Sequence, residues 1–102
     1  MLNTQHLLTF KTLVEVGSFT RTAKLLGLTQ PAVSQHIQKL EAKLDGSLLI
    51  RHGRSTEMTE AGKVLYKYVK ELELCYEAFM VAWSANLVEK PDYEDMKQAA
   101  DK

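Results

Sequence analysis

The chain has 102 residues, which suits one compact domain with at most one extended appendage. Lysine and arginine together number 13, and so do aspartate and glutamate, so the formal net charge is zero and any nucleic-acid footprint must be local. The single cysteine, Cys75, excludes an internal disulfide framework and a four-cysteine zinc site.

The N-terminal part of the sequence predicts two helices, each followed by a glycine. Apolar residues recur on one helical face over Thr4–Val16, and Gly17 suits the C-terminal end of that helix. Ser18 is a good N-cap for a second, short helix over Phe19–Leu26, which Gly27 ends in the left-handed conformation. Glycine therefore marks the end of both predicted helices.

A third helix is predicted over Gln30–Leu44, directly after the second. Thr29 is its N-cap, and Pro31 lies in the first turn, where the missing backbone N–H has no consequence. Gly46 is expected to end this helix. Two helices joined by a turn of about three residues that contains a glycine are the signature of a helix-turn-helix.

The next segment departs from helical periodicity and predicts a β-hairpin, or wing. Leu48–Ile50 is typical of a short buried strand, Arg51–Ser55 of a polar turn, and Thr56–Met58 of a returning strand. The expected fold class is therefore mainly α, a winged helix-turn-helix of three helices plus a short hairpin, followed by a long helix.

That long fourth helix is predicted from its N-cap, Thr59, to about Val88. Its apolar residues recur at alternating spacings of three and four, the heptad pattern of a helix that packs on a partner helix. The seam consists of Ala61, Leu65, Tyr68, Leu72, Cys75, Phe79 and Ala82, widened on one flank by Val64, Tyr76, Met80 and Trp83. We expect a winged helix-turn-helix over residues 1–58, a dimerisation helix over 59–88 and a flexible polar tail over 89–102.

The zero net charge hides a partition along the chain. Residues 18–54 contain six basic and two acidic residues, a net charge of +4, whereas residues 55–102 contain six basic and ten acidic residues, a net charge of −4. The positive part coincides with the helix-turn-helix and the wing, as expected where a protein meets phosphates. Surface lysines and arginines also keep a domain soluble, so charge alone leaves both interpretations open.

The start of the third helix carries side chains that can donate and accept hydrogen bonds, whereas Val33, Ile37 and Leu40 face the core. An α-helix fits the major groove of DNA, where Gln and Ser can read base edges, and a helix N-terminus offers N–H groups to phosphate. The alternative is a set of ordinary solvated positions. The candidate contacts are Thr29, Gln30, Pro31, Ser34, Gln35 and Gln38.

Several separated motifs resemble the DNA-binding domain of LysR-type transcriptional regulators. They are the runs Gly17–Ala23 and Leu28–Ile37, then Leu40, Glu41 and Leu44, and finally Leu48, Arg51, Arg54 and Met58–Gly62. The resemblance covers about residues 4–85. It implies a winged helix-turn-helix with a linker helix that dimerises against the linker helix of its partner.

The resemblance also implies roles for individual residues. Gln30, Pro31 and Ser34 match the recognition-helix motif, whereas Gln35 stands where the family often has arginine, which changes one base or phosphate contact. With the backbone positions of the second helix and the wing arginines included, the full candidate set is Ser18, Thr20, Arg21, Thr29, Gln30, Pro31, Ser34, Gln35, Gln38, Arg51 and Arg54. Arg54 is expected in the minor groove, and Arg51 either contacts DNA or has a structural role by pairing with Glu41 or a helix end.

The sequence therefore predicts a homodimer that reads a palindromic operator in double-stranded DNA. The dimer residues are expected to be Leu65, Tyr68, Leu72, Cys75, Phe79 and Trp83, although an aromatic stripe of this kind could instead line a ligand pocket. The alternative function is a short LysR-like protein that acts mainly by heterodimerising through its linker helix. The family's effector-binding domain is absent from these 102 residues.

Other classes of function find little support in the sequence. His6, His36 and His52 are too scattered for a metal site, and no nucleophile triad or phosphate-binding loop is present, so we expect no cofactor, no metal and no enzyme. The N-terminus does not resemble a signal peptide, and the longest apolar run, Ala78–Trp83, is too short to span a bilayer. We expect a cytoplasmic protein without a membrane partner.

Overall fold

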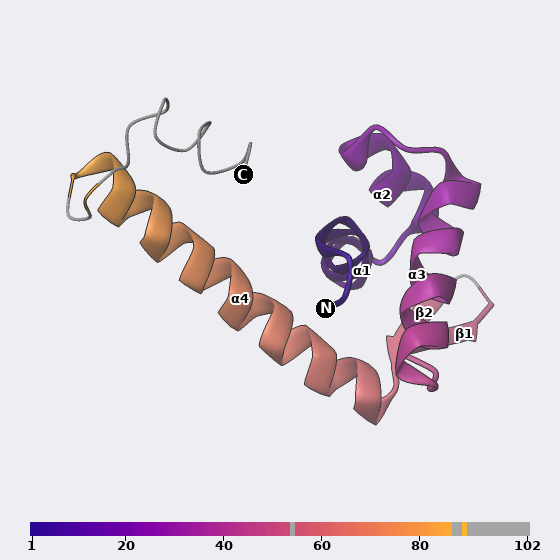
Figure 1. Ribbon diagram of the computed structural model, residues 1–102. Helices are drawn as coiled ribbons and strands as arrows, with labels where there is room; N and C mark the ends of the chain where they lie inside the picture. Colours follow the sequence, from indigo (N-terminus) through magenta and orange to yellow (C-terminus); the bar gives the residue numbers. More distant parts are fainter. Residues whose placement is uncertain (54, 87–88, 90–102) are drawn as a thin grey trace, which may run out of the picture. The chain divides into compact units, whose positions relative to one another are not determined.

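The computed structural model describes residues 1–53, 55–86 and 89. Within these residues, four helices and one hairpin follow one another (Figure 1). They are α1 (Thr4–Val16), α2 (Phe19–Leu26), α3 (Gln30–Leu44), β1 (Leu49–His52), β2 (Ser55–Met58) and α4 (Glu60–Ser84). The chain forms two compact units, Met1–Glu71 and Leu72–Lys102, and α4 contributes to both.

The first three helices have the bounds that their caps predict. The side chains of Ser18 and Thr29 accept hydrogen bonds from the first turns of α2 and α3, and Gly17 and Gly27 are left-handed, with φ of 76° and 66°. Helix α3 ends at Leu44 as predicted, but its C-cap is Asp45 and not the predicted Gly46. Asp45 takes the left-handed position with φ 52°, which aspartate tolerates better than most residues.

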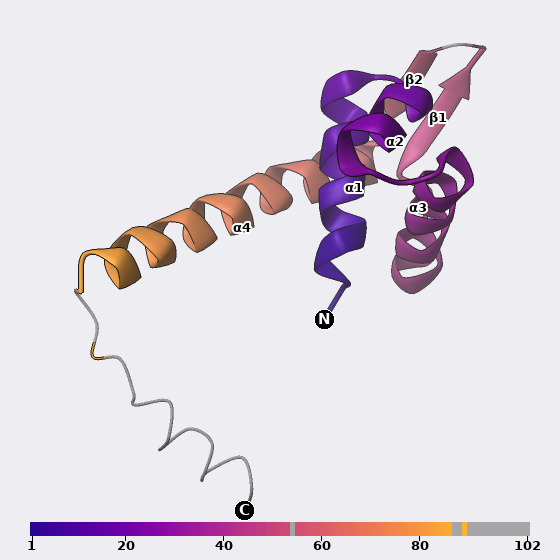
Figure 2. The same ribbon diagram turned by 90° about the horizontal axis from the view of Figure 1, so that it is seen from above.

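The core of the first unit lies where α1, α2 and α3 meet, as both ribbon views show (Figures 1 and 2). Two threonines are fully buried in it, and their hydroxyls are paired. Thr22 donates to the carbonyl of Ser18, while the hydroxyl of Thr9 lies 2.8 Å from Nδ1 of His36 and so joins α1 to α3. The buried apolar residues are Leu7, Phe10, Leu13, Ala23, Val33, Ile37, Leu40, Leu48 and Val69.

The wing is a two-stranded antiparallel hairpin whose register runs from Leu49↔Met58 to His52↔Ser55. The expected strand is present but begins at Leu49, one residue later than predicted. Its expected burial was wrong, because Leu48, which precedes β1, is the buried residue of Leu48–Ile50. The hairpin has one covered side, so Ile50 is 43% exposed. The predicted polar turn was too long, since Arg51 and Ser55 belong to the strands.

The base of the wing is held by polar contacts from both sides. Glu41, near the end of α3, accepts a hydrogen bond from the Leu48 backbone N–H at 2.7 Å. Thr59 donates through its hydroxyl to the carbonyl of Ser47 at 2.7 Å and accepts the N–H of Gly62, so it caps α4 as predicted. These contacts fix the hairpin to α3 before it and to the start of α4 after it.

Helix α4 ends at Ser84 rather than near the predicted Val88. The following turn contains Asn86 with φ 59°, a left-handed conformation that ends the helical path. Val88 and residues 90–102, where the tail was predicted, lie outside the described residues. Leu65 packs partly against the core of the first unit, whereas Tyr68 is 52% exposed.

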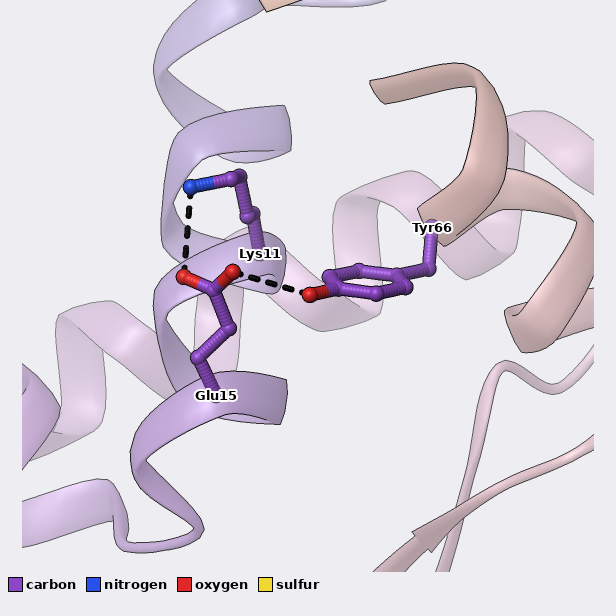
Figure 3. Close-up of polar contacts among 3 residues, drawn as sticks. All are labelled: Lys11, Glu15 and Tyr66. Atoms are coloured by element: carbon purple, nitrogen blue, oxygen red, sulfur yellow. Dashed lines mark hydrogen bonds and ion pairs between the residues drawn. The ribbon is translucent and has the colours of Figure 1, made fainter. Parts of the chain in front are cut away.

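Glu15 links α1 to the beginning of α4 (Figure 3). One carboxylate oxygen accepts the Tyr66 hydroxyl at 2.8 Å and the other lies 3.2 Å from Nζ of Lys11. The Tyr66 hydrogen bond, followed by Lys11 and Lys70, holds the pKa of Glu15 below its ordinary value, while partial burial acts in the opposite direction. We call these residues, Lys11, Glu15 and Tyr66, the Glu15 clasp.

Tyr66→Phe is expected to lower the free energy of unfolding by about 1 kcal/mol at neutral pH, a modest value because Glu15 is partly solvated. Because the pKa of Glu15 is lowered in the folded state, the contact stabilises the protein fully above the ordinary glutamate pKa of about 4.3. This stabilisation is lost as the pH falls through the folded-state pKa of Glu15. The difference from wild type should therefore shrink in acid. Urea unfolding at several pH values measures it, with Tyr76→Phe as the control; a difference independent of pH would contradict the clasp.

Candidate nucleic-acid interface

The outer face of α3 is polar and accessible, opposite the buried Val33, Ile37 and Leu40. Gln30, Pro31, Gln35 and Gln38 are exposed there, and Ser34 is half-buried beside them. The helix periodicity that buries one face therefore leaves a continuous row of hydrogen-bonding side chains on the other. This is the surface that the sequence predicts to enter a major groove.

Two of the predicted contact residues also cap helices. Ser18 Oγ accepts the N–H of Arg21 at 3.2 Å, and Thr29 Oγ1 accepts the N–H of Ala32 at 3.2 Å. A hydroxyl that accepts in this way still has its own proton to donate, so capping leaves Ser18 and Thr29 able to bond to a phosphate oxygen. Neither α2 nor α3 has an acidic residue in its first turn, so both N-termini remain favourable to anions.

A groove runs between α3, the start of α2 and the base of the wing. It brings together three residues that the sequence nominated from separate elements, Ser34, Gln38 and Arg51. Its remaining lining residues are Phe19, Ile37, Glu41, Ser47 and Leu49. The groove therefore joins the polar face of α3 and Arg51 of β1 into one surface.

Arg51 has a partner that the sequence did not suggest. Its guanidinium carbon lies 4.1 Å from the centroid of the Phe19 ring. The predicted alternative partner, Glu41, uses one carboxylate oxygen to hold the Leu48 N–H. Phe19 lies within a run that resembles the family, but nothing in local periodicity indicates that it would meet a strand residue so far along the chain.

Three of the remaining predicted positions belong to α2 and the wing. Thr20 and Arg21 are exposed on α2, and Arg54 lies outside the described residues. Exposed Lys24, Lys39 and Lys43 add positive charge on α2 and α3. On the wing, Nε2 of His52 lies 3.5 Å from a carboxylate oxygen of Glu57.

The histidines of α1 and α3 lie next to each other. The rings of His6 and His36 stack with centroids 4.6 Å apart, and burial together with His36 and Lys39 lowers the pKa of His6. Among residues 1–53, 55–86 and 89, no three His, Cys, Asp or Glu side chains come together as possible metal ligands. In that same part of the chain, no helix is both long and apolar enough to cross a membrane.

These features define the chain as a winged helix-turn-helix protein. Residues 4–63 match the family described as "Bacterial regulatory helix-turn-helix protein, lysR family". The chain belongs to this family and contains its helix-turn-helix DNA-binding domain.

Known relatives are transcriptional regulators. The nitrogen assimilation regulatory protein nac of Klebsiella aerogenes is 41% identical over 71 residues, 70% of this chain and 23% of that protein. A probable RuBisCO transcriptional regulator of a Nostoc species is 47% identical over 68 residues, 66% of this chain and 20% of that protein. The chain thus spans about a quarter or less of the length of the curated relatives that it matches.

Solved structures of the same fold include complexes with DNA. The BenM DNA-binding domain bound to benA site 1 DNA is 35% identical, with a TM-score of 0.73 over 84% of this chain and 99% of that one. The CbnR DNA-binding domain in complex with DNA is 30% identical, with a TM-score of 0.72 over 82% of this chain and 98% of that one. Full-length LysG from Corynebacterium glutamicum is 28% identical, with a TM-score of 0.80, covering 89% of this chain and 32% of that one.

Proposed function

We propose that this chain binds double-stranded DNA sequence-specifically as a homodimer and acts as the DNA-binding part of a transcriptional regulator. The observation that carries the proposal is the groove in which Ser34 and Gln38 of α3 meet Arg51 of the wing. Helix α3 would enter the major groove, and the wing would contact the adjacent backbone or minor groove.

The dimer is proposed from the apolar residues of the second unit. Leu72, Phe79 and Met80 are 48%, 50% and 40% exposed in the single chain, and Cys75 is exposed on the same predicted seam. A two-fold dimer would cover this surface on both copies at once. We retain residues 1–58 as the DNA-binding domain and 59–88 as the dimerisation helix. The symmetry predicts an imperfect palindrome with half-sites about one or two helical turns apart.

Base reading by α3 is tested with Gln30→Ala and Ser34→Ala. Each variant is expected to lose roughly 1–3 kcal/mol of discrimination between cognate and scrambled duplexes for every base contact removed. Competition binding measures this ratio, and Gln5→Ala, an exposed glutamine on α1, is the matched control. Unchanged preference in both α3 variants would show that this helix does not read the bases.

The proposal as a whole is tested by fluorescence anisotropy with duplex DNA across a salt series. A random duplex is compared with a selected pool of palindromes. Affinity that falls steeply with salt and is higher for some palindromes is the expected result. A folded dimer that does not bind DNA at low salt would contradict the proposal and favour a role through heterodimerisation.

A further inference from the structure

We propose that Phe19 is a positioning residue for DNA binding, whose ring holds the Arg51 guanidinium in the groove beside α3. This inference rests on the proposed DNA-binding function and adds a residue to it. Phe19 is the first residue of α2 and packs against the core, while Arg51 belongs to β1. The 4.1 Å separation between the guanidinium carbon and the ring centroid is a cation–π contact that joins the two elements.

Phe19 and Arg51 differ in how much the fold around them restricts their side chains. Phe19 is half-buried at the N-terminus of a capped helix, whereas Arg51 is exposed on a short hairpin. An arginine side chain loses much rotamer freedom when it binds, and holding it in place beforehand reduces that loss. The affinity for DNA should therefore be higher with the ring than without it.

The contact leaves the hydrogen-bond donors of Arg51 available to DNA. A cation–π contact uses the face of the guanidinium, so its N–H donors stay available for phosphate oxygens or base edges. Phe19, Arg51, Ser34 and Gln38 all line the same groove. Glu41 also lines it, but its carboxylate holds the Leu48 N–H at 2.7 Å. The donors of Arg51 are thereby placed next to the hydrogen-bonding row of α3.

The test is a double-mutant cycle in the full chain, measured as affinity for a selected duplex. Phe19→Leu keeps an apolar side chain but removes the ring, and should weaken binding about two- to fivefold. Phe19→Tyr should retain wild-type affinity. Combined with Arg51→Ala, Phe19→Leu should have no further effect, whereas combined with Lys24→Ala it should keep its full effect.

The outcomes separate this inference from the proposed function. An equal loss from Phe19→Leu in the Arg51→Ala background, or an Arg51→Ala variant with unchanged affinity, would overturn the positioning role alone. Absence of DNA binding by the wild type would overturn the proposed function as well. If Phe19→Leu does not fold, NMR of the wild type without DNA decides: a ring-current shift of the Arg51 side-chain N–H is expected, and a random-coil value would refute the contact.

Discussion

Phe79→Glu is expected to raise the dissociation constant of the proposed homodimer at least about 100-fold, equivalent to roughly 3 kcal/mol. Phe79 is 50% exposed in the single chain, and its ring centroid lies 5.7 Å from that of Trp83. In a dimer that buries this seam, the variant would place an unpaired carboxylate among apolar side chains on both copies. Light scattering over a range of protein concentrations measures the change.

Val81→Glu is the matched control for this prediction. Val81 is 66% exposed and lies two positions beyond Phe79, which is about 200° around an α-helix. The control adds the same charge to the same helix away from the predicted seam and should remain dimeric. A Phe79→Glu protein that dimerises like the wild type would show that the seam does not include this residue.

Gly62→Ala is expected to lower the free energy of unfolding by about 3 kcal/mol, although alanine normally favours a helix over glycine by about 1 kcal/mol. Gly62 is buried in the first turn of α4. A Cβ at this position would overlap the carbonyl oxygen of Leu48 and would lie 3.3 Å from Cβ of Met58. Because that carbonyl also accepts the Thr59 N–H at 3.0 Å, the backbone on both sides of the wing would have to move.

Gly46→Ala provides the comparison for Gly62→Ala. A Cβ at Gly46 would lie 3.9 Å from the nearest backbone oxygen, an ordinary contact, so stability should change by less than about 0.5 kcal/mol. Chemical denaturation of both variants measures the difference. Equal stability of Gly62→Ala and wild type would mean that the backbone between the wing and α4 can shift to accommodate the added Cβ without loss of stability.

The first three helices could be predicted to the residue because their ends are decided locally. Ser18 and Thr29 cap them through hydrogen bonds within three residues, and Gly27 is left-handed in a turn that tolerates little else. The end of α3 at Leu44 was predicted as well, but the left-handed position after it was assigned to Gly46 and is taken by Asp45, because either residue is able to adopt it. Local sequence shows that a helix stops there, but not which residue adopts the unusual φ.

The wing and the groove depend on contacts between residues that are far apart in the sequence, so the sequence predicted them only in part. The polar row on α3 follows from periodicity, so Gln30, Ser34 and Gln38 could be nominated. The pairing of Arg51 with the Phe19 ring joins two elements and has no periodic signal. The start of the hairpin depends in the same way on the hydrogen bond between the Leu48 backbone N–H and Glu41, which has no signal in the local sequence.

The hydrogen bond that Glu41 accepts from the base of the wing limits which parts of α3 could be replaced to change DNA specificity. Glu41 belongs to α3, yet its carboxylate holds the backbone that leads into β1. A whole α3 helix grafted from another protein would lose this contact unless it carried a glutamate at this position, and the base of the wing would then be held only from the Thr59 side. Redesign of specificity should therefore replace only the solvent-facing side chains of α3 and keep its last two turns native.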